Sequence, residues 1–257
     1  MKPSSLAIFL VLALPLAAPG GEPIRFTAGP ARVSLIELYT SEGCSSCPPA
    51  ERWLAALRDN PGLWRDFVPV SFHVNYWDNL GWTDRLATPA FTQREYAYSA
   101  AWGSSSVYTP CFVRDGAEWK PGSPVADGAR APGVLTVVFD GSGRGRVEFT
   151  PTASLPGGSG SGFIAHVALL GGGLSSRVSA GENSGETLQH EFVALAMVDR
   201  PLVAAASDKV LHADFTLPPP LAPNAARQAL AVWITRQGEL APLQATGRWL
   251  KGGAGSP

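Results

Sequence analysis

The sequence predicts an α/β fold over residues 31–119, followed by a β-rich C-terminal half over residues 134–250. The first part alternates short apolar runs with segments of helical periodicity, an order typical of a small sheet with flanking helices. The second part contains short apolar stretches separated by Gly and Pro clusters, a pattern of strands joined by turns. The 257 residues include 28 glycines and 23 prolines, a composition that favours strands and loops over a helical bundle.

The α/β part begins with a buried strand at residues 33–40 (VSLIELYT), which ends at a turn that contains Cys44. A helix is predicted over residues 49–59, where apolar side chains recur at helical spacing. A second strand covers residues 67–74. Because Pro69 has no N–H to donate, we expect it near the start of this strand or at a sheet edge.

An aromatic loop over residues 75–88 leads into a second predicted helix, which begins at Pro89 and runs to about residue 102. Proline is favoured at the first position of a helix, which supports this start. A third strand is predicted over residues 107–114 and is followed by Asp115-Gly116, a hairpin signal.

The rest of the chain reads as a linker at residues 120–133, a β-rich region at residues 134–250 and a disordered tail at residues 251–257. A Gly/Ser-rich stretch over residues 151–162 interrupts the β-rich region. Strands are predicted at residues 134–139, 146–150, 163–170, 192–198, 211–217 and 230–235.

Residues 1–20 have the features of a signal peptide. Lys2 precedes an apolar run at residues 6–16, and small residues follow up to Gly20, after which we expect cleavage. The run is shorter than the roughly 20 apolar residues of a membrane span. We therefore expect an exported protein, periplasmic or secreted, with no membrane span after cleavage. A net charge of -1 argues against a nucleic-acid partner.

The chain has three cysteines, and Cys44-Ser45-Ser46-Cys47 is the motif that carries chemistry. Its position between a strand and a helix places both sulfurs near a helix N-terminus, where free N–H groups and the helix dipole stabilise a thiolate. Three interpretations stay open: a redox-active pair, half of a mixed Cys/His metal site, or a chemically idle pair. No second such pair exists, which excludes a four-cysteine zinc site.

Several motifs resemble an exported thioredoxin-like family catalogued as domain of unknown function 1223. The resemblance covers about residues 31–250. It implies a thioredoxin-like sheet with flanking helices in the first half. Three residues depart from the family's usual pattern: Glu42, where Gln is common, Asn75, where Asp is usual, and Cys111, where most members carry Gln. The motifs that carry the resemblance are LIELYTSEGCSSCPP at residues 35–49, FHVNYWDNLGW at 72–82, TPAFTQR at 88–94, VYTP at 107–110 and GENSGET at 181–187.

The resemblance also implies that Thr109-Pro110 takes the place of the cis-proline that abuts the cysteine pair in thioredoxin-like proteins. Cys111 would then lie next to the pair. Three converging sulfurs could bind a soft ion such as Cu(I), or Cys111 could exchange with the disulfide. The alternative is that Cys111 is a small buried hydrophobe on a strand.

Glu37 and His73 are the remaining candidates. A buried Glu37 on the first strand could accept a proton from Cys47 through water, and its alternative is an exposed edge carboxylate. His73 ends the second strand, where it is a weak candidate for a base or a metal ligand. The other histidines, His166, His190 and His212, are interpreted as structural. A group of aromatic residues is interpreted as part of the core, and the alternative is that it binds an unfolded polypeptide. Its members are Tyr76, Trp77, Trp82, Tyr96, Tyr98, Trp102 and Tyr108.

These features favour thiol–disulfide exchange with protein or small-molecule partners and no cofactor. In this hypothesis Cys44 attacks, Cys47 resolves the mixed disulfide and Pro110 shapes the substrate groove. One alternative is a copper-binding protein that uses Cys44, Cys47 and Cys111, with His73 as a weaker ligand. The other is a redox-silent binding module with a structural disulfide.

Overall fold

The computed structural model describes residues 22–123, 131–152, 162–204 and 209–251. The signal peptide predicted at residues 1–20 therefore lies outside the described residues, as do nearly all of the predicted tail and parts of the predicted linker and Gly/Ser-rich stretch.

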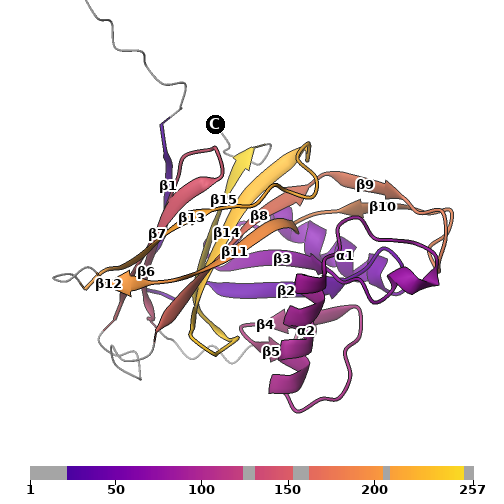
Figure 1. Cartoon of the computed structure of the whole chain (residues 1–257), viewed down its shortest axis with the longest axis horizontal. Coiled ribbons are helices and arrows are strands. Elements are labelled where there is room, and N and C mark those ends of the chain that lie inside the picture. Colours follow the sequence, from indigo (N-terminus) through magenta and orange to yellow (C-terminus); the bar gives the residue numbers. More distant parts are fainter. Residues whose placement is uncertain (1–21, 124–130, 153–161, 205–208, 252–257) are drawn as a thin grey trace, which may run out of the picture.

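The protein is mostly β-sheet, so the prediction of a thioredoxin-like α/β sheet with flanking helices is wrong. Strands make up 46% of the described residues and helices 14%, with two α-helices among them. The physical reason is that the strands of the first half do not complete a sheet of their own. Their open edge is hydrogen-bonded by a strand from the second half, and the sheet continues into further C-terminal strands (Figure 1).

The largest sheet has eight strands and contains both halves of the chain. β2 and β3 pair in parallel, and β3 in turn pairs in parallel with β11 through Ser71 and Val193. The predicted regions 31–119 and 134–250 thus share one sheet. Its order is β15 (Pro242–Lys251), β14 (Arg227–Arg236), β8 (Phe163–Gly172), β11 (Val193–Pro201), β3 (Phe67–His73), β2 (Ser34–Thr40), β4 (Cys111–Arg114) and β5 (Ala117–Glu118).

Pro69 lies in a central strand of this sheet, third from the start of β3. The N–H of Ser71 donates to the Phe192 carbonyl on the β11 side, and alternate residues of a strand point their N–H groups to the same side. The nitrogen of Pro69 therefore also faces β11, but β11 pairs with β3 only at Ser71. A proline is tolerated here because no ladder hydrogen bond is due at its nitrogen.

A five-stranded sheet packs against the C-terminal strands. The rings of Phe149 and Phe163 meet edge to face across the two sheets, with centroids 5.7 Å apart, and the buried apolar residues of both sheets form one core. The order of this sheet is β1 (Ile24–Ala28), β6 (Gly133–Phe139), β7 (Arg144–Pro151), β13 (Leu211–Thr216) and β12 (Val203–Ala204).

A separate two-stranded arm, made of β9 (Leu174–Arg177) and β10 (Thr187–His190), extends from the large sheet toward the first helix (Figure 1). The loop that joins its strands, residues 178–186, contains most of the GENSGET motif. The arm brings a segment from the second half of the chain to the cysteine pair of the first half.

Both α-helices begin at residues that suit a first turn. α1 (Cys47–Ala56) has Pro48 and Pro49 there, where missing N–H groups cost little, and α2 (Pro89–Ala101) begins after Thr88, whose side chain accepts a hydrogen bond from the Phe91 N–H. Short 3₁₀ turns are η1 (Leu57–Asp59) and η2 (Asp78–Leu80). No helix of the described residues is long and apolar enough to cross a bilayer.

Candidate functional site

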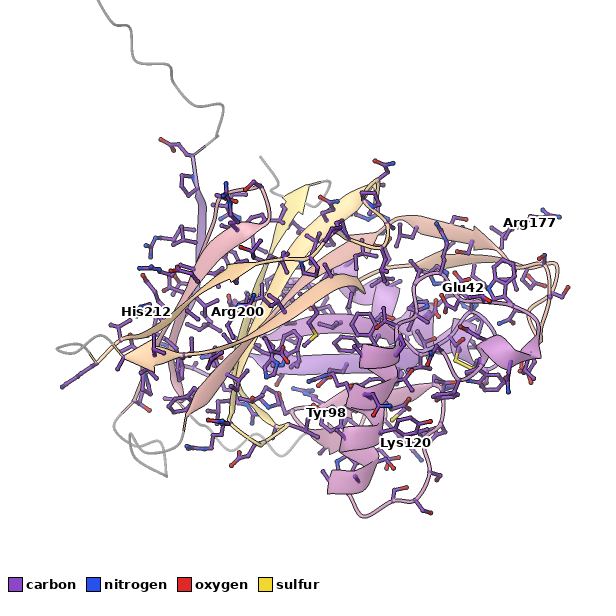
Figure 2. All side chains as sticks on the ribbon, in the orientation of Figure 1. Glu42, Tyr98, Lys120, Arg177, Arg200 and His212 are labelled. Carbon is purple, nitrogen blue, oxygen red and sulfur yellow. A yellow bond between two sulfur atoms is a disulfide. The ribbon has the colours of Figure 1, made fainter. Side chains whose placement is uncertain are left out.

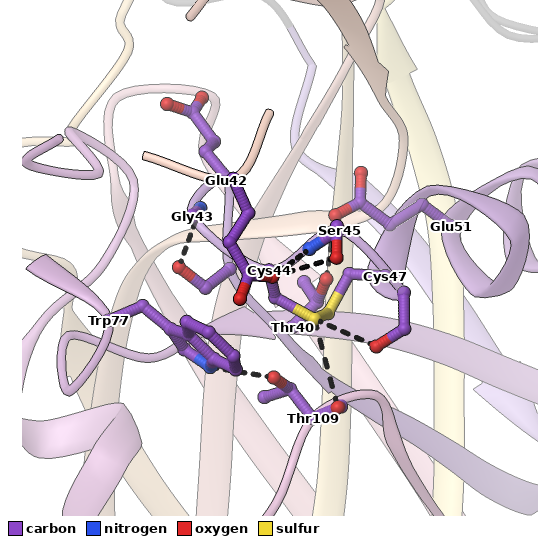
Figure 3. The surroundings of a disulfide bond; sticks show 12 residues. Thr40, Glu42, Gly43, Cys44, Ser45, Cys47, Glu51, Trp77 and Thr109 are labelled. Carbon is purple, nitrogen blue, oxygen red and sulfur yellow. Dashed lines mark hydrogen bonds between the residues drawn. A yellow bond between two sulfur atoms is a disulfide. The ribbon is translucent and has the colours of Figure 1, made fainter. Parts of the chain in front are cut away.

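Cys44 and Cys47 form a disulfide where β2 leads into α1, with their Cα atoms 5.5 Å apart (Figure 3). Cys47 is the first residue of α1, and Cys44 lies in the preceding turn. Both side chains have 0% exposure, although Ser45 and Ser46 between them are exposed. The pair is thus buried beneath a thin exposed loop.

Two polar groups contact the Cys44 sulfur. The Ser46 hydroxyl oxygen lies 3.3 Å from Cys44 Sγ, and the Thr109 carbonyl oxygen lies 3.7 Å from it (Figure 3). The peptide bond between Thr109 and Pro110 is cis. The Thr109 side chain accepts a hydrogen bond of 2.8 Å from the indole N–H of Trp77, which holds this segment against the pair.

The loop of the arm covers the pair from the other side. The Asn183 side-chain amide donates hydrogen bonds of 2.9 Å to the carbonyl oxygens of both Glu42 and Cys44. Glu182 accepts from the Ser45 N–H at 3.0 Å and from the Ser45 hydroxyl at 2.7 Å, and these bonds lower the pKa of Glu182. Residues 178–186, the covering loop, therefore help to explain why the sulfurs are buried.

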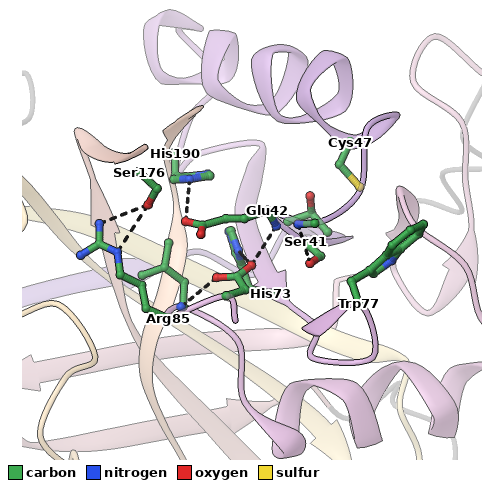
Figure 4. Close-up of polar contacts among 12 residues, drawn as sticks. Ser41, Glu42, Cys47, His73, Trp77, Arg85, Ser176 and His190 are labelled. Carbon is green, nitrogen blue, oxygen red and sulfur yellow. Dashed lines mark hydrogen bonds and ion pairs between the residues drawn. The ribbon is translucent and has the colours of Figure 1, made fainter. Parts of the chain in front are cut away.

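A buried polar cluster lies beside the pair, made of Glu42, Glu51, His73, Asp84 and His190. Figure 4 shows Glu42, His73 and His190 of this cluster. His190 contacts two carboxylates: its Nδ1 is 2.6 Å from Glu51 Oε2, and its Nε2 is 3.2 Å from Glu42 Oε1. His73 Nδ1 is 2.7 Å from Asp84 Oδ2, which also accepts from the Glu42 N–H at 2.9 Å. The two imidazole rings meet edge to face, with centroids 5.0 Å apart.

Charge in this cluster is set by competing effects. Burial lowers the pKa of His190, but contacts with Glu42 and Glu51 outweigh burial and raise the pKa to about 10. Burial raises the pKa of Asp84, but the charge and hydrogen bond of His73 outweigh it and lower the pKa.

The cluster lies at the arm end of the molecule, where Glu42 is labelled in Figure 2, far from His212 at the opposite end.

Glu37 belongs to a different network, on the side of the sheet that faces α2. Its Oε2 accepts from Arg94 Nε at 2.7 Å and from the Tyr39 hydroxyl at 3.0 Å. Its Oε1 accepts from the Tyr98 hydroxyl at 2.6 Å. Glu37 is buried, and its carboxylate is occupied by three donors, none of which is a cysteine.

Cys111 is a free, buried thiol. It lies near Glu95, whose two carboxylate oxygens are buried without a hydrogen-bond partner. Burial and the charge of Glu95 raise the pKa of Cys111 to about 12, and burial raises the pKa of Glu95 to about 7. At neutral pH and without a metal, Cys111 is therefore a protonated thiol, which is a poor nucleophile.

The structure brings together only some of the residues singled out in the sequence. Cys44, Cys47 and the Thr109–Pro110 segment meet, while Glu37 is bonded to Arg94, and Cys111 forms no disulfide. Of the aromatic group, Tyr98 is buried in the core, whereas Tyr96 and Tyr108 are exposed.

Sequence reasoning missed the cluster around His73. His190 was interpreted as structural, and Glu51, Asp84 and Asn183 were not singled out. One signal was available for Glu51, because it lies four residues after Cys47 and so on the same face of α1. No local signal pointed to His190, which is 139 residues from Glu51.

The fold and the site define a β-rich protein with a buried disulfide at a strand-to-helix junction and a charged cluster beside it. The chain belongs to the family described as Protein of unknown function (DUF1223), whose model matches residues 35–235. No curated protein matches the chain.

Two solved structures resemble it. One is the protein AGR_C_4864 from Agrobacterium tumefaciens, at 22% identity and a TM-score of 0.52, with 90% of this chain and 97% of that chain covered. The other is HBP35 of Porphyromonas gingivalis, at 14% identity and a TM-score of 0.55, with 85% of this chain and 75% of that chain covered. At these identities the likeness concerns the fold alone.

Proposed function

We propose that this protein exchanges thiols and disulfides through Cys44 and Cys47. The observation that carries the proposal is the position of the pair: a disulfide at the N-terminus of α1, with Cys44 Sγ between the Ser46 hydroxyl and the Thr109 carbonyl. Residues so placed can stabilise a thiolate and can hold an extended substrate segment beside the reacting sulfur.

The chemistry is a pair of reversible displacements. A substrate thiolate attacks Cys44 Sγ, the Cys44–Cys47 bond breaks, and Cys47 leaves as a thiolate. A second substrate thiolate then attacks the substrate sulfur of the mixed disulfide and releases Cys44 as a thiolate. The substrate gains a disulfide and the pair is reduced; the reverse sequence reduces a substrate disulfide and reoxidises the pair.

Local structure identifies what stabilises a Cys44 thiolate. Pro48 and Pro49 remove two of the N–H groups that the first turn of α1 would otherwise present. The helix dipole still favours negative charge there, and the Ser46 hydroxyl, 3.3 Å from Cys44 Sγ, is positioned to donate a hydrogen bond to it.

Access to the pair requires movement, because both sulfurs have 0% exposure. The covering loop is attached through side chains, Glu182 and Asn183, so it can open without loss of a sheet hydrogen bond. We propose that partners are thiols or disulfides that enter when this loop opens. Export of the protein is part of the proposal, since an oxidising compartment maintains such a pair.

The test is turnover of a fluorescent disulfide peptide in a glutathione buffer. We expect Cys44→Ser to abolish turnover and Cys47→Ser to trap a mixed disulfide. Cys111→Ser is the matched control and retains activity, because Cys111 is not part of the pair. Unchanged turnover in Cys44→Ser would refute the proposal. A reduction potential below about −300 mV would instead indicate a structural disulfide and a redox-silent binding module.

A further inference from the structure

Three side chains of the buried polar cluster direct ligand atoms toward one another: Glu51 on α1, His73 at the end of β3 and His190 at the end of β10. One ligand atom from each lies within 4.8 Å of the other two, and all three residues are buried. We propose that Glu51, His73 and His190 bind one divalent transition-metal ion of the zinc type. The site uses none of the three cysteines, so it does not depend on the proposed thiol–disulfide exchange.

The orientation of His73 provides an independent observation. Its side chain has 0% exposure, and its Nε2 has no hydrogen-bond partner. Its Nδ1 lies 2.7 Å from Asp84 Oδ2, so Nε2 is the ring nitrogen left for a ligand. A buried polar atom without a partner costs free energy. A metal ion at this nitrogen removes that cost.

Each proposed ligand is held by a second polar group, which is typical of metal sites. The Thr40 hydroxyl donates to Glu51 Oε1 at 2.7 Å and leaves Oε2 for the metal. Asp84 Oδ2 contacts His73 Nδ1 and leaves His73 Nε2 for the metal. Glu42 Oε1 forms an ion pair with His190 Nε2 at 3.2 Å, without a hydrogen bond between the two atoms, and this contact leaves His190 Nδ1 for the metal.

The distances require only small side-chain movements. Glu51 Oε2 and His190 Nδ1 are now 2.6 Å apart with a proton between them, and a metal ion takes the place of this proton. Tetrahedral bonds of about 2.0–2.1 Å hold ligand atoms roughly 3.3 Å apart. Since one ligand atom of each residue already lies within 4.8 Å of the other two, small side-chain rotations complete the site.

The donor set and its charge identify the class of ion. Two imidazoles and one carboxylate match the ligands of zinc sites that keep an open fourth position. Two further buried carboxylates, Glu42 and Asp84, adjoin the ligands. Buried negative charge needs a compensating cation, and a dication bound to neutral imidazoles supplies more positive charge than the single proton it displaces.

The experiment uses the full-length chain, freed of metal by a chelator and kept oxidised so that the pair stays a disulfide. Zn²⁺ alone is titrated by calorimetry, and Co²⁺ is followed by its visible absorption bands. We expect one ion per chain and bands of the intensity typical of four- or five-coordinate cobalt. Absence of saturable binding by this wild-type protein overturns the proposal.

Substitutions of the proposed ligands test whether the bound ion lies at this site. His73→Gln and Glu51→Gln each weaken Zn²⁺ binding at least 100-fold, and Thr40→Val, which only releases Glu51, weakens it about 10- to 100-fold. His166→Gln is the matched control, since His166 is also a partly buried histidine, with Nδ1 2.7 Å from Asp199, and binds Zn²⁺ like the wild type. Unchanged affinity in folded His73→Gln, verified by circular dichroism, overturns the site.

A chain with all three cysteines replaced by serine separates this site from the sulfurs. We expect it to bind Zn²⁺ with wild-type affinity while it has lost all thiol–disulfide exchange. Loss of Zn²⁺ binding in this folded variant places the ion on the sulfurs and overturns the proposal. If the ligand variants fail to fold, the wild-type cobalt spectrum and the Thr40→Val affinity decide the outcome.

Discussion

The thiol–disulfide exchange proposed above requires the covering loop to open before the disulfide reacts, and Asn183→Ala tests this directly. In the closed state the Asn183 amide donates to the carbonyl oxygens of Glu42 and Cys44, each at 2.9 Å. A typical intramolecular hydrogen bond contributes about 0.5–1.5 kcal/mol net, so the two bonds together stabilise the closed loop by about 1–3 kcal/mol. Removing them raises the population of the open loop roughly 5- to 150-fold when the loop opens and closes faster than the reaction.

The assay is reduction of the Cys44–Cys47 disulfide in excess dithiothreitol, quenched at intervals and followed by thiol labelling. We expect the rate constant of Asn183→Ala to rise by the same factor as the open population. Gln189→Ala is the matched control on the same arm, because the Gln189 amide donates to Ser175 and not to the cysteine loop. A rate equal to or below that of the wild type, in a variant of unchanged stability, would refute the reasoning.

Three further predictions concern charges near the site. In the reduced protein, Ser46→Ala raises the pKa of the Cys44 thiol by about 1–2 units, because a hydrogen bond to a charged group is worth about 1.5–3 kcal/mol; the pH profile of alkylation measures this, and an unchanged profile contradicts it. Burial raises the pKa of Glu95 from 4.5 to about 7. Folded Glu95 therefore stays protonated at pH values where the unfolded chain ionises, and its contribution to stability, complete below pH 4.5, is lost by about pH 7. The loss is about 3 kcal/mol, and urea unfolding of Glu95→Gln at both pH values should lack it. Arg94→Met leaves the buried Glu37 carboxylate without a cationic partner, although two tyrosine hydroxyls still donate to it. It lowers the free energy of unfolding by about 3–5 kcal/mol, and adding Glu37→Gln restores part of this loss; a double variant as unstable as the single one would exclude this explanation.

Part of the fold follows from local pattern. Apolar runs identified β2 and β3, and proline at a first helical turn identified the start of α2. The predicted helix at residues 49–59 corresponds to α1 and η1, although α1 already begins at Cys47. These elements were predictable because helical and strand periodicity depend on residues close together in the chain.

The error in the fold class has one identifiable source. Strand–helix alternation specifies which residues are buried, but not which strand hydrogen-bonds to the open side of β3. Backbone N–H and C=O groups are alike at every residue, so the pairing of Ser71 with Val193 leaves no trace in local sequence. Pro69 lies near the start of β3, as expected, but in a central strand and not at a sheet edge, and this is possible because β11 pairs with β3 only at Ser71.

The candidate site likewise has some features that follow from local sequence and others that depend on contacts between distant segments. Local sequence was enough to place Cys44 and Cys47 at a strand-to-helix junction, because an apolar run precedes them and a segment of helical periodicity follows. A separation of three residues then keeps the two sulfurs close together. The contacts of Asn183 with the loop over the pair, and of His190 with His73 and Glu51, depend on the folded arrangement of the whole chain. These contacts join segments more than a hundred residues apart, and their geometry exists only once the arm has docked beside α1.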